Sequence, residues 1–87
     1  MMLRIGYFAE PAAPDVHPAK LMVAKGHFAT REEAVAHARA NAERLHAHSF
    51  IIDFPDGKAE RQLRQGKAWK IADFESPAKP RSLNLSR

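Results

Sequence analysis

A capping box at Thr30 marks the start of one helix, and this helix constrains the fold more than any other feature of the sequence. The Thr30 hydroxyl can accept a hydrogen bond from the Glu33 backbone N–H, and the Glu33 carboxylate can reach back to the Thr30 N–H. Glu32 and Glu33 also place negative charge in the first turn, where the helix dipole favours it. The sequence therefore predicts an amphipathic helix over about 31–46.

The apolar side of this helix is mostly alanine, so a sheet must supply the bulk of the core. Apolar residues recur at the three- and four-residue steps that place them on one face of a helix. They are Ala34, Val35, Ala38, Ala42 and Leu45. In the strand that follows, alternation places Phe50, Ile52 and Phe54 together on one face and directs Ile51 and Asp53 to the other.

Two strands are predicted before the helix. Apolar and other residues alternate over 3–8, and residues 20–24 form a short apolar run. Between them, the proline-rich segment 9–19 can form neither a helix nor a central strand, so it is interpreted as a loop.

Two more strands are predicted after the hairpin turn that Asp56-Gly57 indicates. Residues 59–65 are interpreted as an edge strand, although their helix formers leave a helix open as the alternative. Residues 67–72 alternate more clearly and predict a last strand.

These elements predict an α+β fold, with one helix packed on an antiparallel sheet of about four strands. We expect a single domain over 1–74 and a flexible, disordered basic tail over 75–87. A domain of this size buries roughly 60% of its unfolded surface, so its core is modest. A homodimer that covers an exposed sheet face would enlarge that core.

Composition narrows the class of protein. The 87 residues include no cysteine, which excludes disulfides and thiolate metal sites and fits a reducing compartment. No apolar run approaches a membrane span, and residues 1–8 are too short and broken for a signal peptide. We therefore expect a cytoplasmic protein without a membrane partner.

Positive charge gathers in the last third of the sequence. Residues 57–87 hold eight Lys/Arg against three Asp/Glu, whereas residues 1–56 hold six against seven. Basic side chains around an aromatic residue can hold phosphates and offer a stacking surface, as single-stranded nucleic acid requires. The candidate contact residues are Lys58, Arg61, Arg64, Lys67, Trp69 and Lys70. The alternative is that these charges protect an edge strand while Trp69 belongs to the core.

The sequence predicts no catalytic, cofactor or metal site. The helical histidines His37, His46 and His48 lack the i,i+4 spacing that would hold one ion. Asp53 and Asp56 are close in sequence, but Asp56 has a turn role and Asp53 is expected to face solvent. The glycines are isolated, so no phosphate-binding loop is present.

The segment 20–72 resembles a family of short uncharacterised bacterial domains built from a hairpin, a helix and a second hairpin. The resemblance is carried by Thr30, Glu33, Ala34, Ala38 and Ala42, by Phe50-Ile51-Ile52, and by Asp56-Gly57. It implies an α+β unit and no particular activity. The T-x-E-E-A helix start is also similar to that of small toxin-neutralising antitoxins of the HicB kind.

We expect a non-catalytic binding module, most simply one that binds a protein partner or associates with itself. Single-stranded nucleic-acid binding through the basic segment 58–70 is one alternative. An antitoxin-like role beside a small toxin is another.

Overall fold

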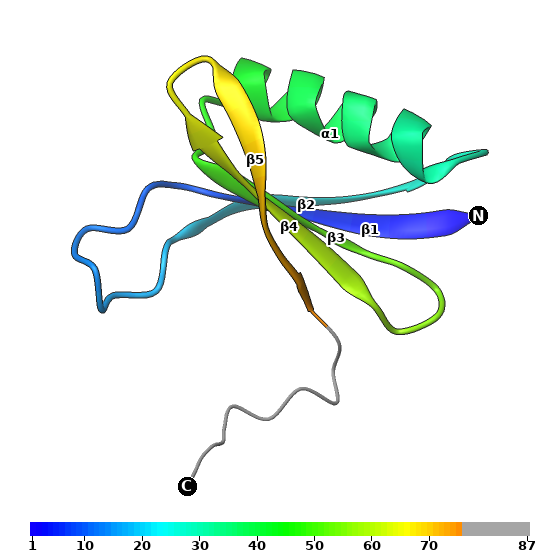
Figure 1. Ribbon diagram of the computed structural model, residues 1–87, viewed down its shortest axis with the longest axis horizontal. Coiled ribbons are helices and arrows are strands. Elements are labelled where there is room, and N and C mark those ends of the chain that lie inside the picture. Colours follow the sequence, from blue (N-terminus) through cyan, green and yellow to red (C-terminus); the bar gives the residue numbers. More distant parts are fainter. Residues whose placement is uncertain (76–87) are drawn as a thin grey trace, which may run out of the picture.

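One helix lies across one face of a five-stranded antiparallel sheet in the computed structural model (Figure 1). The structure describes residues 1–75, and side chains for residues 1–72. The elements are β1 (Met2–Phe8), β2 (Lys20–His27), α1 (Arg31–Leu45), β3 (Ser49–Asp53), β4 (Ala59–Gln65) and β5 (Ala68–Glu75). The strands lie in the order β2-β1-β3-β4-β5. The predicted α+β class is confirmed, with five strands in place of about four.

Both ends of α1 are capped. The Thr30 hydroxyl accepts from the Glu33 N–H at 3.1 Å, as the capping box predicts. The Glu33 carboxylate accepts from the Ala29 N–H at 2.8 Å, one residue earlier than the Thr30 N–H expected from the sequence. At the other end, His46 adopts a left-handed conformation with φ of 58°, and its N–H returns to the carbonyl groups of the last turn.

The core lies between α1 and the three strands beneath it. Phe50 and Ile52 are completely buried, so the predicted apolar face of β3 is confirmed. Every second residue of β1, from Leu3 to Tyr7, also belongs to the core, and the small alanine side chains of α1 let the helix pack close to the sheet. The other buried apolar residues are Leu3, Ile5, Tyr7, Ala34, Val35, Ala38, Ala42 and Ala47. Phe54 and Leu45 pack against this cluster from its rim.

The predicted position of residues 59–65 is wrong, because β4 is an interior strand and the edges are β2 and β5. The segment looks like an edge strand because it is polar, yet Glu60 and Gln62 are completely buried. Their side chains are hydrogen-bonded to arginines of α1, which satisfies them beneath the helix. The turn at Asp56-Gly57 is as predicted, and the turns on both sides of β4 contain a glycine with positive φ, Gly57 and Gly66.

The proline-rich segment 9–19 connects β1 to β2 as a loop, as expected. Its ends are joined by a hydrogen bond of 2.9 Å from the Ala9 N–H to the Ala19 carbonyl. No helix of the described chain is long and apolar enough to cross a membrane. The tail expected over 75–87 lies outside the described residues from residue 76 onward.

Candidate functional site

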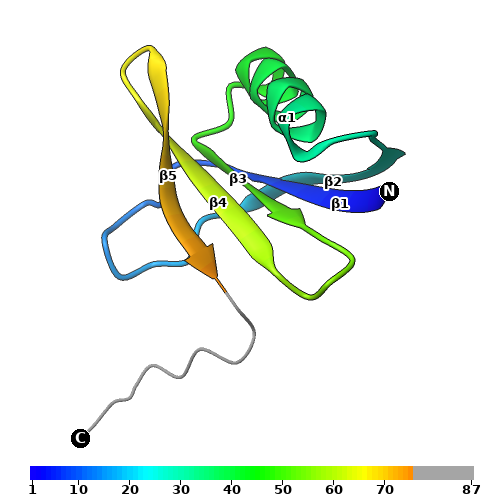
Figure 2. The ribbon, with the colours of Figure 1, turned by 45° about the vertical axis from the view of Figure 1, so that its right-hand side comes forward.

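No helix of the described residues covers the side of the sheet opposite α1. Figures 1 and 2 show the helix on one side of the sheet only. We call the opposite side the open face. Strand register and alternation place the following residues on it: Arg4, Gly6, Phe8, Lys20, Val23, Lys25, Ser49, Ile51, Asp53, Arg61, Leu63 and Lys70.

The open face carries several cationic side chains that form no ion pair with another described side chain. It carries five cationic side chains, which are Arg4, Lys20, Lys25, Arg61 and Lys70. None of the five makes a hydrogen bond or an ion pair with another side chain of the described chain. Asp53 is the one carboxylate on this face among residues 1–72, and it lies opposite Arg4 in the register without forming an ion pair. Such a surface attracts anions.

The middle of the open face is apolar and carries an aromatic ring. A Cβ atom at Gly6 would lie only 3.3 Å from Cε2 of Phe8, so the ring lies over the glycine. Val23 and Ile51 flank Gly6 in the neighbouring strands. Together with Arg4 and other neighbours, they line a shallow depression of about 210 Å³. The face thus combines a half-buried ring with surrounding cations.

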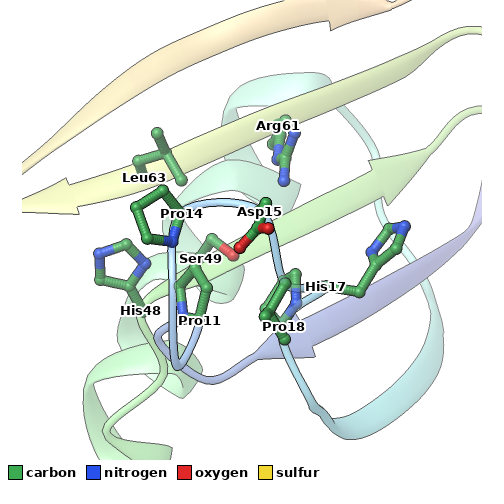
Figure 3. Close-up of a pocket in the computed structure, with 10 residues that line it drawn as sticks. Pro11, Pro14, Asp15, His17, Pro18, His48, Ser49, Arg61 and Leu63 are labelled. Carbon is green, nitrogen blue, oxygen red and sulfur yellow. The ribbon is translucent and has the colours of Figure 1, made fainter.

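A larger cavity lies where the proline-rich loop passes in front of the sheet (Figure 3). Its volume is about 420 Å³, within the roughly 300–1,000 Å³ typical of small-ligand sites. We call it the loop cavity. On the sheet side it is lined by His48, Ser49, Arg61 and Leu63, and on the loop side by residues between 11 and 18. Figure 3 shows Arg61 extending from its strand toward the loop.

On the helix side of the sheet, the arginines are engaged by other side chains. Arg31 donates two hydrogen bonds to the Glu60 carboxylate, at 2.7 and 2.6 Å. Gln62 donates to the same carboxylate at 2.7 Å and accepts from Arg39 at 2.9 Å. This buried network joins α1 to β4, so its function is structural. The hydrogen bonds to Glu60 also raise the pKa of Arg31 above its ordinary value.

Trp69 belongs to a second cluster on the helix side. Its ring lies 5.2 Å from that of Phe50, and its indole N–H donates to Glu43 at 3.2 Å. Arg64 forms an ion pair with Glu43 and lies 5.9 Å from the centre of the Trp69 ring. Trp69 is half-buried and packs against the core, and Arg64 is already neutralised.

The structure does not bring the six predicted contact residues onto one surface. Arg61 and Lys70 lie on the open face, whereas Arg64 and Trp69 lie on the helix side of the sheet. Lys58 and Lys67 lie in the turns before and after β4, at opposite ends of that strand. The sheet therefore separates the Trp69 ring from two of the five cations that were expected to surround it.

The sequence-based prediction omits three cations of the open face, because it rests on basic residues that are close together along the chain. Arg4, Lys20 and Lys25 are distant from residues 58–70 in sequence, but β1 and β2 bring them to the same face. The alternation of β1 does predict the face of Arg4. Its neighbours Leu3 and Ile5 point into the core, so Arg4 points to the opposite side of the sheet. Without the order of the strands, however, the sequence does not show that β1 and β2 lie in the same sheet beside β3 and β4.

Two of the histidines, His17 and His48, line the loop cavity. No group of three or more His, Asp or Glu side chains in the described part of the chain is arranged to hold a metal ion. His37 instead packs its ring 5.2 Å from that of Phe28, beside the first half of α1.

No protein-family model, curated protein or solved structure matches this chain.

Proposed function

We propose that this protein is a non-catalytic binding module that holds single-stranded nucleic acid on its open face. The observation that carries the proposal is the contrast between the two sides of the sheet. The arginines beneath and beside α1 are engaged by Glu60, Gln62 and Glu43, whereas the five cations of the open face have no partner among the described residues. Unengaged cations on a broad surface suit a polyanion.

The apolar middle of the open face favours a single strand over a duplex. Single-stranded nucleic acid exposes its bases, which stack on aromatic side chains while the phosphates contact Lys and Arg. The Phe8 ring, with Val23 and Ile51 beside it, supplies an apolar surface among the cations. A duplex would leave that surface without a partner, because its bases are stacked inside the helix.

This proposal keeps two residues of the sequence-based hypothesis and replaces the others. Arg61 and Lys70 remain as contacts. Arg4, Lys20 and Lys25 take the place of the cations in the turns and on the helix side, and Phe8 takes the place of Trp69.

The test is a salt titration of binding to a labelled oligothymidylate, followed by fluorescence anisotropy. If all five cations contact phosphates, the logarithm of the affinity should fall with that of the salt concentration with a slope of about −3.5. Between about 50 and 200 mM salt, the affinity should then fall roughly 100-fold. The double variant Arg4→Gln, Lys25→Gln should reduce the slope by about 1.4.

The control removes the same amount of charge away from the open face. The double variant Arg44→Gln, Lys67→Gln changes the helix and the β4–β5 turn and should leave the slope nearly unchanged. The proposal fails if the wild-type protein does not bind at low salt. It also fails if the two double variants lose affinity equally, because binding would then depend on net charge alone.

Self-association, the first expectation from the sequence, is a second candidate, and the edge strand β2 favours it. Leu21, Met22 and Val23 are 45%, 37% and 43% exposed on this strand. A long apolar edge strand can pair with a second copy of the chain through its free backbone groups. Sedimentation equilibrium should then show a dimer that Met22→Glu makes monomeric. A wild-type protein that stays monomeric at high concentration would exclude this candidate.

A further inference from the structure

The loop cavity holds a positively charged group that no other part of the described chain neutralises. The Nε atom of Arg61 is buried and has no hydrogen-bond partner there. A buried donor of this kind calls for an acceptor from a ligand or from water. A guanidinium group binds phosphate and carboxylate groups especially well, because its N–H groups match their oxygen atoms in pairs.

The opposite wall of the cavity carries the opposite charge. Asp15 lines it from the loop, and Figure 3 shows Asp15 on the part of the loop that passes in front of the sheet. Asp15 and Arg61 form no ion pair, so both groups remain available within the described structure. A simple anion such as inorganic phosphate would satisfy Arg61 but would be repelled by Asp15. The cavity therefore suits a ligand with an anionic group at one end and a hydrogen-bond donor at the other.

Apart from His17, His48 and Ser49, the remaining lining of the cavity is apolar. Pro11, Pro14 and Pro18 face the cavity from the loop, and Leu63 faces it from β4. Proline side chains present rigid apolar surfaces, and they restrict the loop before a ligand binds. A flat, weakly polar group can pack between the loop and the sheet at this place.

We infer that the loop cavity is a subsite for one nucleotide, with the phosphate on Arg61 and an aminated base beside Asp15. The inference rests on the proposed function, because the cavity shares Ser49, Arg61 and Leu63 with the open face. A carboxylate accepts a hydrogen bond from the exocyclic amino group of cytosine, which uracil lacks. The subsite therefore prefers cytidine monophosphate to uridine monophosphate.

The experiment measures the affinity of four probes by chemical-shift titration of the full-length protein: cytidine monophosphate, uridine monophosphate, cytidine and inorganic phosphate. Cytidine monophosphate should bind best, with shifts at residues 11–18, 48–49 and 61–63. Uridine monophosphate should bind roughly tenfold more weakly. Arg61→Gln should weaken cytidine monophosphate about tenfold or more and leave cytidine little affected. Asp15→Asn should bring the two mononucleotides to nearly equal affinity.

Arg44→Gln is the control, since it removes an arginine of α1 that lies outside both the loop cavity and the open face. It should leave mononucleotide affinity unchanged, and urea unfolding followed by Trp69 fluorescence checks that each variant folds. Equal binding of the two mononucleotides to the wild-type protein would overturn the inference. Inorganic phosphate that competes as well as cytidine monophosphate would do the same.

Oligonucleotides distinguish this inference from the proposed function and separate the two sources of the nucleotide. If oligocytidylate binds with the expected salt slope but Arg61→Gln weakens it no more than Arg4→Gln, the subsite is refuted and the open-face proposal stands. If cytidine monophosphate binds at the cavity but no oligonucleotide binds, the open-face proposal fails and the cavity is a site for free nucleotides. If oligocytidylate exceeds oligouridylate only when Asp15 is present, both proposals are supported.

Discussion

Replacing Arg31 with methionine should destabilise the fold by about 3 kcal/mol, because it leaves a buried carboxylate without its counter-charge. Glu60 is completely buried, and two of its three hydrogen bonds come from Arg31. Breaking a buried ion pair from one side costs about 3–5 kcal/mol. The lower end applies here because the Arg31 side chain is 40% exposed, so water reaches part of the site.

The double variant Arg31→Met, Glu60→Leu separates the effect of the unpaired charge from the loss of the contact. Exchanging both members of a buried pair for apolar residues is often nearly neutral, so most of the lost stability should return. Recovery should stop about 1–2 kcal/mol short of the wild type, because Gln62 loses the acceptor for its amide.

The measurement is urea unfolding followed by Trp69 fluorescence, with thermal unfolding as a second probe. For a domain of this size, 3 kcal/mol corresponds to a fall in Tm of roughly 12–24 °C. Arg44→Met is the control, since Arg44 is an exposed arginine of α1 whose hydrogen bond goes to Asn41 and not to a buried carboxylate. It should change stability by about 0.5 kcal/mol or less. A similarly small effect of Arg31→Met, or a double variant less stable than the single one, would refute the reasoning.

Three further substitutions test single groups in the core and at the start of the helix. The buried Tyr7 hydroxyl makes no hydrogen bond of normal geometry, although the Asn41 side chain lies beside it, so Tyr7→Phe should preserve or raise stability at neutral pH. Burial raises the pKa of Tyr7, so Tyr7 ionises in the unfolded state at a lower pH than in the folded state. The wild type should therefore lose stability as pH rises above about 10. Urea midpoints measured from about pH 9 to 11 should fall less for Tyr7→Phe than for the wild type. Phe50→Ala should cost about 3–5 kcal/mol in the same urea assay, since Phe50 is completely buried, and a loss below about 1 kcal/mol would contradict its place in the core. Thr30→Ala should cost about 1 kcal/mol by loss of the helix cap, measured by circular dichroism during unfolding; no change would mean that the cap adds nothing.

Short sequence patterns predict most of the fold, because helix caps, strand alternation and turns each depend on residues that are close together in the sequence. The cap at Thr30, the alternation around Phe50 and the turn at Gly57 each depend on residues a few positions apart. The place of β4 could not be predicted in this way. Glu60 looks like a surface residue until its partner Arg31 is known, and that partner lies 29 positions away.

The candidate site was less predictable for the same reason. Basic residues that are neighbours in sequence, such as Arg61 and Arg64, lie on opposite sides of the sheet. Arg4 and Lys25, far apart in sequence, are opposite one another in the register. Which charges share a surface depends on strand order, which is set by long-range pairing rather than by local propensity.

The buried network between α1 and β4 lies on the opposite side of the sheet from the proposed binding residues, so folding and binding depend on different side chains. Glu60 and Gln62 anchor the helix on one side of the sheet. Exposed positions on the other side of the sheet, such as Arg4 and Lys25, can therefore mutate with little penalty to folding. Such a scaffold can acquire new binding specificities through substitutions on the side of the sheet opposite α1. The same positions could be randomised in a library without first stabilising the parent protein.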